Sequence, residues 1–250
     1  MTTHTHDLSN RVGIVTGAGT GIGAATATAL SAGGAKVALL GRRLEPLVEQ
    51  ARRIDGLAVA ADVSDSGQLA AAFDQAREAH GPADLVVANA GQMLPATFAT
   101  ADPDEWRRML DVNVLGLAET GRLAIPDLLK AAADGRPADL VLISSIGAHL
   151  TIDKYAVYMA SKAAVSHLSR GLRQELGPQG VRVRAIEPGM TATDLGSDMG
   201  DQAARDELAE FREQVPPISP ELIAEAIAWS CALPADTNAS VVEVLPTIQG

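Results

Sequence analysis

Short apolar runs and helical stretches alternate along almost the whole chain. The apolar runs have the length and composition of buried strands and lie at 12–16, 36–40, 57–60, 84–88, 139–144, 181–186 and 241–245. The helical stretches between them lie at 24–32, 43–55, 66–80, 102–133, 154–177 and 219–232. Strands that alternate with helices in this way are typical of a parallel sheet covered on both faces. We therefore predict an α/β fold with a doubly wound parallel sheet.

The same pattern predicts a single domain over residues 10–250, preceded by a flexible tail at 1–9. No internal repeat, low-complexity tract or Pro/Gly/Ser-rich linker divides the chain. A hydrophobic content of 47% is sufficient for a sizeable core. The alternation breaks once, at about 190–217, where we predict a substrate lid with one short helix near 202–214.

A glycine-rich loop directly follows the first predicted strand. It reads Gly17-Ala18-Gly19-Thr20-Gly21-Ile22-Gly23 and opens the helical stretch at 24–32. Residues without a Cβ allow the backbone to approach a pyrophosphate, whose charge meets the N–H groups at the helix N-terminus. Glycine-rich loops also form ordinary turns, but the strand before this one and the helix after it supply the context of a Rossmann-type dinucleotide site.

Two arginines at the end of the second strand bear on the choice of dinucleotide. In dinucleotide-binding folds a carboxylate here accepts from the ribose 2′-OH of NAD and repels the 2′-phosphate of NADP. This chain has Gly41 at that place, followed by Arg42 and Arg43. Arginine makes charge-assisted contacts with phosphate, so we expect NADP(H) to be favoured over NAD(H). The alternative is that both arginines are solvated at the start of the next helix.

Composition and charge exclude several other classes of function. The net charge of −11 argues against a nucleic-acid or anionic-membrane surface. The single cysteine, Cys231, excludes a disulfide framework, and no Cys/His cluster has the spacing of a metal site. His4 and His6 lie in the polar tail, where we expect solvated side chains rather than ligands. With no signal peptide and no apolar run near 18 residues, we expect a cytoplasmic protein without a membrane partner.

The strongest chemical signal is Tyr158-Met159-Ala160-Ser161-Lys162, with Ser145 thirteen residues before it. Residues four apart are neighbours on a helix surface. An ammonium beside a phenol favours the phenolate, so we expect the pKa of Tyr158 to fall from about 10 toward neutral pH. Such a group can protonate a carbonyl oxygen or deprotonate an alcohol while a hydride moves. The alternative is a buried tyrosine and a surface lysine that meet by accident.

The ordered set of motifs resembles the short-chain dehydrogenase/reductase family of NAD(P)-dependent oxidoreductases over roughly residues 10–246. The matching positions are Thr16-Gly17-x-x-x-Gly21-x-Gly23, Asp62-Val63, Asn89-Ala90-Gly91, Asn113, Ser145, Tyr158-x-x-x-Lys162 and Pro188-Gly189-x-x-x-Thr193. Glu187-Pro188-Gly189 and the ending at 243–247 are similar to an NADP-dependent branch acting on small hydroxy acids and aldehydes. That branch usually has Arg where this chain has Leu245.

The resemblance implies a role for each matching residue. Tyr158 would transfer the proton, Lys162 would lower its pKa and hold the nicotinamide ribose, and Ser145, rather than the adjacent Ser144, would bind the substrate oxygen. Asn113 would distort its helix and hold a water that links Lys162 to solvent. The remaining cofactor contacts would come from Gly17, Thr20, Gly21, Ile22, Gly23, Arg42, Arg43, Asp62, Val63, Asn89, Ala90, Gly91, Pro188, Gly189, Thr191 and Thr193.

The substrate, a small carbonyl or alcohol, is expected over the carboxyl ends of the strands. Candidate walls of its pocket are Met93, Leu94, Ile146, His149, Leu150, Tyr155, Met190, Leu195 and Met199. His149 is also a possible base, although Ser145, Tyr158 and Lys162 already supply the proton chemistry. Between Asp194 and Pro217 the lid has seven acidic residues and two arginines, which offers little to attract an anionic substrate.

The sequence leaves one alternative open for the oligomeric state and another for the activity. Small residues on the Tyr158 helix permit close approach of another helix, from this chain or from a second subunit, and the resemblance implies a homo-oligomer, either a tetramer or a dimer. The activity that the motifs favour is carbonyl–alcohol oxidoreduction. The alternative is a non-enzymatic NADPH-binding regulatory module, but such a protein would be expected to lose Tyr158 or Lys162, and this chain keeps both.

Overall fold

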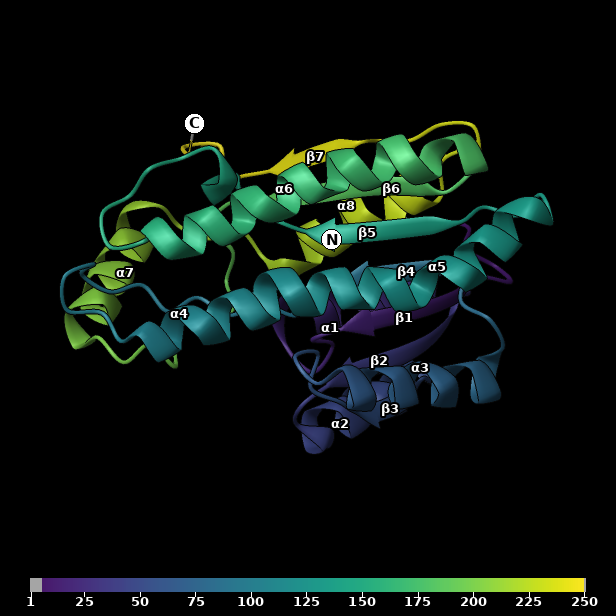
Figure 1. Cartoon of the computed structure of the whole chain (residues 1–250), viewed down its shortest axis with the longest axis horizontal. Coiled ribbons are helices and arrows are strands. Elements are labelled where there is room, and N and C mark those ends of the chain that lie inside the picture. Colours follow the sequence, from purple (N-terminus) through teal and green to yellow (C-terminus); the bar gives the residue numbers. More distant parts are fainter. Residues whose placement is uncertain (1–5, 250) are drawn as a thin grey trace.

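The computed structural model describes residues 6–249 as a sheet of seven parallel strands between two layers of helices (Figure 1). The spatial order is β3-β2-β1-β4-β5-β6-β7, which confirms the predicted doubly wound topology. The strands are β1 (Val12–Thr16), β2 (Lys36–Gly41), β3 (Leu57–Ala60), β4 (Leu85–Ala88), β5 (Asp139–Ile143), β6 (Arg182–Pro188) and β7 (Val241–Val244). All seven lie within about two residues of the predicted runs.

The helices divide between the two faces of the sheet. One face is covered by α3 (Ser66–His80), α5 (Leu117–Ala133) and α6 (Ala156–Leu176), and the other by α1 (Gly21–Ala32), α2 (Leu44–Ile54) and α8 (Pro220–Cys231). The predicted helix at 102–133 consists of three segments: α4 (Pro103–Leu110), the π-helical segment η1 (Asp111–Gly116) and α5. Within residues 6–249, no helix is long and apolar enough to cross a membrane.

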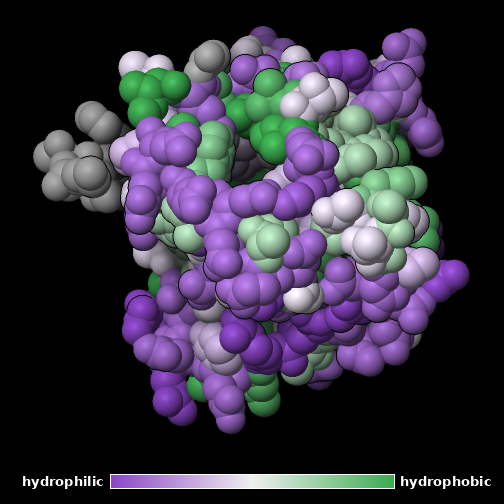
Figure 2. Space-filling view, turned by 90° about the vertical axis from the view of Figure 1, so that its left-hand side faces the viewer, coloured by the Kyte–Doolittle hydropathy of each residue, from purple (hydrophilic) through white to green (hydrophobic). Residues whose placement is uncertain are grey.

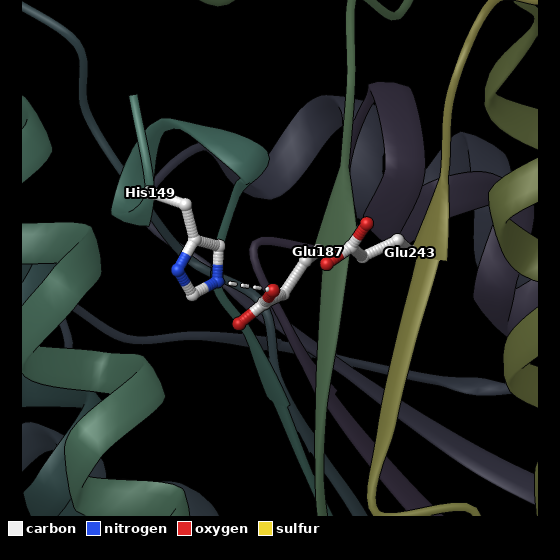
Figure 3. A group of neighbouring side chains, drawn as sticks. All are labelled: His149, Glu187 and Glu243. Carbon is white, nitrogen blue, oxygen red and sulfur yellow. Dashed lines mark hydrogen bonds and ion pairs between the residues drawn. The ribbon is translucent and has the colours of Figure 1, made fainter. Parts of the chain in front are cut away.

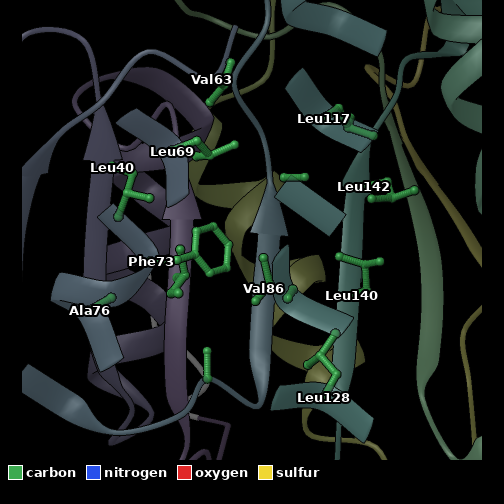
Figure 4. Close-up of a cluster of buried hydrophobic side chains, with 14 of the residues drawn as sticks. Leu40, Val63, Leu69, Phe73, Ala76, Val86, Leu117, Leu128, Leu140 and Leu142 are labelled. Atoms are coloured by element: carbon green, nitrogen blue, oxygen red, sulfur yellow. The ribbon is translucent and has the colours of Figure 1, made fainter. Parts of the chain in front are cut away.

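Each face of the sheet has its own apolar core. Figure 4 shows the first, in which Phe73 of α3 and Leu128 of α5 pack on Val86 and Leu140 of the central strands. These four side chains are fully buried. Because side chains alternate across each strand, neighbouring residues such as Leu85 and Val87 enter the second core, beneath α1 and α8. Burial on both faces explains why the strands have continuous rather than alternating apolar sequences.

The packed part of the chain begins earlier than predicted. Residues 1–5 of the proposed flexible tail lie outside the described residues, but Leu8 is buried and its N–H donates to Gly33 O at 2.8 Å. His6 Nε2 lies 3.0 Å from Glu225 Oε1 on α8. Residues 6–9 are therefore held against α1 and α8, a contact that polar composition alone did not indicate.

The region predicted as a lid contains a helix with the predicted bounds, α7 (Gln202–Gln214). Its base is closed by backbone bonds from Ala192 N to Ile218 O at 2.8 Å and from Ile218 N to Met190 O at 3.0 Å. The segment thus leaves the sheet after β6 and returns to it before α8. Leu208 of α7 packs into a small apolar cluster with Met93 and Met199, so the helix is seated on the domain.

A buried ionic cluster joins the amino ends of the central strands, opposite the edge where β6 leads into α7. Asp139, which is fully buried at the start of β5, pairs with Arg11 and Arg182 at 2.7 Å each and with Arg184. Arg11 also pairs with Asp84 at 2.7 Å. The Asp139 carboxylate therefore forms ion pairs with three guanidinium groups, which reach it from both sides of β5. Its removal would leave buried positive charge uncompensated.

This cluster makes Asp139 a strong determinant of stability. Asp139→Asn should lower the free energy of unfolding by about 3–5 kcal/mol, because the arginines lose their shared counter-charge in a desolvated site. Glu49→Gln is the matched control, since it breaks only an exposed pair with Arg53; there we expect a loss below ~0.5 kcal/mol. Urea denaturation measures both values. Equal stabilities of the two variants would contradict this account of the cluster.

Candidate active site

A cavity of about 760 Å³ opens at the carboxyl ends of the strands. Most of the predicted site residues line it, although they come from positions as far apart as 17 and 195 in the sequence. Those lining it are Gly17, Thr20, Gly21, Ile22, Arg42, Arg43, Asp62, Val63, Asn89, Ala90, Gly91, Met93, Ser145, Ile146, Leu150, Tyr155, Tyr158, Lys162, Pro188, Gly189, Met190, Thr191, Thr193 and Leu195.

The glycine loop forms one end of this cavity, and its shape requires glycine at two points. Gly17 has φ +65°, and a Cβ there would lie 2.9 Å from Ala90 Cα. A Cβ at Gly23 would lie 2.3 Å from Gly17 O. Gly23 itself does not line the cavity; it lets α1 begin close against the turn. Thr20, the N-cap of α1, makes no side-chain cap and the first turn has no acidic residue, so the helix N-terminus is open toward an anion.

Asn89 and Thr16 hold the glycine loop against the end of β4. Asn89 Nδ2 donates to Thr16 O at 2.9 Å, while Thr16 Oγ1 accepts from Asn89 N at 3.0 Å and from Ala90 N at 3.1 Å. Asn89 was predicted as a cofactor contact. It lines the cavity, but its side-chain amide already donates to the backbone of the loop. Asn89 therefore fixes the position of the glycine loop.

The second strand delivers positive charge to the same end of the cavity. Gly41 is the last residue of β2, and Arg42 and Arg43 follow it on the cavity wall with exposed side chains. Within residues 6–249 neither arginine forms an ion pair. Asp62, after β3, uses Oδ1 to accept from Ser64 N at 2.9 Å and Ser64 Oγ at 2.7 Å, which fixes the loop beside the buried Val63.

Ser145, Tyr158 and Lys162 meet deeper in the cavity. Ser145 follows β5 and its Oγ accepts from Gly147 N at 3.0 Å. Tyr158 and Lys162 lie on one face of α6, as their spacing predicted, with Lys162 Nζ 5.9 Å from the centre of the Tyr158 ring. Lys162 Nζ donates to Ile143 O at 3.0 Å, which ties the ammonium to the end of β5. Tyr155 packs edge-on against Tyr158, with ring centres 6.5 Å apart.

Burial governs the ionisation of both catalytic candidates. It raises the pKa of Tyr158 to about 12, and the nearby Ser145 hydroxyl offsets only part of that rise. It lowers the pKa of Lys162 from 10.5 to about 8. The prediction of a lowered Tyr158 pKa is therefore wrong for this structure, because desolvation of the phenolate outweighs the other influences on the ring. At neutral pH the phenol keeps its proton and most of Lys162 is charged.

Asn113 lies behind the cavity, inside the π-helical segment. Its Oδ1 accepts from Gln92 N at 2.7 Å, and its Nδ2 donates to Gln92 O at 2.8 Å and to Ser161 Oγ at 3.0 Å. The helix distortion expected at this residue is present. The asparagine is fully buried and joins the loop after β4 to α6. Its proposed role in a water relay remains a prediction.

The substrate end of the cavity differs in part from the prediction. Leu94 and Met199 are buried in the apolar cluster beneath α7 and do not line the cavity, and His149 points away toward Glu187 at 2.8 Å. Their sequence positions were close to true wall residues, but their side chains face elsewhere. Residues that the sequence reasoning missed include Ile152, Glu207, Leu208, Phe211, Arg212 and Gln249. Glu207, Leu208, Phe211 and Arg212 lie on α7, and no local sequence signal indicated that this face of the helix lines the cavity.

Three contacts fix the rim of the cavity. Arg212 Nη2 donates to Thr193 O at 3.1 Å and to Leu195 O at 3.2 Å, which holds α7 to the segment after β6. Lys154, just before α6, pairs with Glu207 of α7. Gln249 Oε1 accepts from Met190 N at 2.7 Å, so the end of the described chain folds back over Gly189. Around this rim, Figure 2 shows hydrophobic patches within a mainly hydrophilic surface on the side where α7 and α4 lie.

The sequence profile described as short chain dehydrogenase matches residues 11–204, well over half of the chain. The chain belongs to the short-chain dehydrogenase family. Among its relatives, an uncharacterized oxidoreductase of Staphylococcus saprophyticus is 34% identical over 246 residues, covering 96% of this chain and 99% of that protein. Another from Staphylococcus aureus strain USA300 is 33% identical over 242 residues, with 96% and 98% covered.

Solved structures of a reductase and a dehydrogenase superpose on this chain. A 3-ketoacyl-(acyl-carrier-protein) reductase from Brucella melitensis, complexed with NADH, has a TM-score of 0.87 at 30% identity, covering 96% of this chain and 99% of that one. A serine dehydrogenase complexed with NADP⁺ has a TM-score of 0.88 at 26% identity, with 96% of each chain covered. The protein is a short-chain oxidoreductase, and nothing in these similarities favours the non-enzymatic alternative.

Proposed function

We propose that this short-chain dehydrogenase interconverts a carbonyl compound and a secondary alcohol with NADP(H), using Tyr158 as the proton donor and acceptor. The observation that carries the proposal is the convergence of Ser145, Tyr158 and Lys162 in the same cavity as the glycine loop. The residues proposed to transfer the proton and the open N-terminus of α1 therefore line the same cavity. The relatives that bind NADH or NADP⁺ support a nicotinamide cofactor.

The residues present fit such a cofactor. The close approach at Gly17 and the uncapped N-terminus of α1 suit a pyrophosphate, and Arg42 and Arg43 suit a 2′-phosphate. Asp62 and Val63 would contact the adenine, and Pro188, Gly189, Thr191 and Thr193 would cover the nicotinamide end. When bound, the cofactor supplies or accepts the hydride.

The chain's own residues handle the proton. Ser145 Oγ and the Tyr158 hydroxyl face the same part of the cavity, so a carbonyl oxygen there would accept hydrogen bonds from both. Because burial keeps Tyr158 protonated at neutral pH, the phenol is ready to donate its proton in the direction of reduction. Lys162, largely charged near neutral pH, stabilises the phenolate that remains.

The walls around this centre favour an uncharged substrate. Met93, Ile146, Ile152, Met190 and Phe211 are apolar. Arg212, the cation that α7 contributes to the cavity, already donates to two backbone carbonyls, while Glu207, Asp194 and Asp198 add negative charge. A screen of ketones, aldehydes, secondary alcohols and 2-oxo acids, followed by NADPH absorbance, would find the substrate. A preference for the 2-oxo acids would contradict the expectation that the cavity walls favour an uncharged substrate.

The first functional prediction concerns Tyr158. Tyr158→Phe should retain less than a tenth of the wild-type kcat, a barrier increase above ~1.4 kcal/mol, because Tyr158 is the group proposed to transfer the proton. NADPH affinity should change little, since the ring remains. Tyr155→Phe is the matched control: it removes a hydroxyl from the adjacent ring and should keep most activity. Steady-state kinetics at varied NADPH concentration tests both variants. Near-wild-type turnover by Tyr158→Phe would contradict the assignment of proton transfer to Tyr158.

The pH dependence of reduction should report Lys162. With Tyr158 protonated up to about pH 12 and Lys162 deprotonating near pH 8, kcat/KM should be level at pH 6–7 and fall about tenfold per unit above pH 8. The sign follows from the lowered pKa of Lys162, which loses its charge as the pH rises. Lys162→Arg, if active, should lose this descending limb because guanidinium stays charged. A level profile to pH 10 in the wild type would rule out a role for the ammonium.

Cofactor preference should depend on the end of β2. A charge-assisted contact from Arg42 or Arg43 is worth ~1.5–3 kcal/mol, so NADPH should bind roughly ten- to over a hundredfold more tightly than NADH. Gly41→Asp with Arg42→Gln should reverse this order, because it adds repulsion as well as removing attraction. A Cβ at Gly41 would meet Leu47 at 3.6 Å, an ordinary contact, so the change is sterically tolerated.

Calorimetric titration of both cofactors provides the measurement. Arg52→Gln is the matched control, since Arg52 lies in the last turn of the same helix, α2, and does not line the cavity. It should leave the ratio of the two affinities unchanged. Equal affinities in the wild type, or tighter NADH, would mean that Arg42 and Arg43 are solvated charges at the start of α2.

A further inference from the structure

Three side chains of the types that bind metal ions lie together outside the cavity. His149 follows the short helix η2 (Ile146–Ala148), Glu187 belongs to β6 and Glu243 to β7 (Figure 3). One ligand atom from each lies within 4.8 Å of the others. None of the three lines the active-site cavity. They are at least 38 residues apart in sequence, and only the parallel pairing of β6 with β7 and the loop after β5 bring them together.

Glu187 is held in a fixed orientation. Its residue is 1% exposed, and Oε1 accepts a hydrogen bond from Ser166 Oγ at 2.6 Å. The other oxygen, Oε2, faces His149 Nε2 at 2.8 Å. Hydrogen bonds to the distal atom of a ligand are the usual means by which proteins orient metal ligands. Ser166 therefore leaves one carboxylate oxygen presented toward the other two residues.

His149, Glu187 and Glu243 together carry negative charge that a bound cation would offset. Glu187 and Glu243 are direct partners in the parallel β6–β7 pair and lie on the same face of the sheet. Like charges placed opposite each other on neighbouring strands destabilise the pairing. Within residues 6–249, Glu243 has no ion-pair partner, and Glu187 has only His149. His149 is 45% exposed, so solvent and ions reach the group.

We propose that His149, Glu187 and Glu243 form a binding site for a divalent transition-metal ion of the Zn²⁺ type. One imidazole with two carboxylates is a ligand set that such ions accept, with water completing the coordination. Bonds near 2.1 Å place tetrahedral ligands about 3.4 Å apart, so the His149–Glu187 contact must open by ~0.6 Å. The exposed side chain of His149 has room to make that movement.

A metal ion here would connect segments that frame the active site. η2 begins directly after Ser145, and Glu187 precedes Pro188 and Gly189 of the cavity wall. The ion would therefore fasten the Ser145 loop to β6 and β7 from the side away from the cavity. This inference does not rest on the proposed reaction, and binding is measurable without a substrate.

Calorimetric titration of the full chain with ZnCl₂, after treatment with a chelator, tests the site. We expect one equivalent of Zn²⁺ to bind, and we expect His149→Ala and Glu243→Gln each to weaken binding by at least about tenfold. Both residues are exposed, so these variants should fold; Glu187→Gln is avoided because that side chain is buried. Mg²⁺, which prefers oxygen ligands and retains its waters, should bind far more weakly than Zn²⁺.

Two matched controls separate this site from other ligands. His4→Ala with His6→Ala removes the histidines near the N-terminus, and Glu221→Gln removes an exposed carboxylate on α8. Both should bind Zn²⁺ as the wild type does. Zn²⁺ should also raise the Tm of the wild type and of the controls, but not that of His149→Ala. The proposal fails if the wild type binds no Zn²⁺, if binding survives both site variants, or if it is lost in the histidine control.

Discussion

The parallel pairing of the strands is the constraint on which the rest of the molecule depends. β1, β4, β5 and β6 run side by side in one direction, so the segments that follow them all emerge at one edge of the sheet. The glycine loop, Asn89, Ser145 and Pro188 come together there without any direct sequence relation. At the opposite edge, Asp139 and its arginines join the starts of the same strands. The ionic cluster therefore supports the strand alignment on which the candidate active site depends.

Burial is the second determinant, and it changes how the proposed catalytic pair, Tyr158 and Lys162, should be understood. An exposed Tyr–Lys pair would act mainly through charge attraction, with a lowered tyrosine pKa. Here desolvation disfavours both charged forms, so Tyr158 stays a phenol and Lys162 becomes easier to deprotonate. In the proposed reaction, the proton that reduction requires would already be on Tyr158. Oxidation would have to remove that proton first, which makes the ammonium of Lys162 more important in that direction.

Local patterns predicted the fold almost completely. Apolar runs of four to six residues predicted all seven strands. The helix predicted at 102–133 was wrong only in its continuity, because residues 111–116, which include the buried Asn113, form a π-helical segment. The residues predicted to hold the cofactor, except Gly23, line the cavity, because most of them follow the carboxyl end of a strand; their contacts with a cofactor remain a prediction. The orientation of loop side chains was not: Leu94, His149 and Met199 lie beside wall residues in the sequence but face the interior or Glu187. No local sequence signal indicated that α7 would form part of the cavity wall, or that Gln249 would fold back over Gly189.

The group at His149, Glu187 and Glu243 shows why spacing rules miss sites of this kind. Metal-site signatures depend on ligands that are close in sequence, whereas these three are brought together by strand register and by one loop. Only His4 and His6, near the N-terminus, have a spacing that resembles a ligand pair, and we expected their side chains to be solvated. A carboxylate that is buried and oriented by a serine is a better-defined ligand than two histidines in a polar segment, because less conformational entropy is lost when the ion binds. Pre-organisation by the fold, rather than the number of ligating residues nearby, is therefore the more informative criterion.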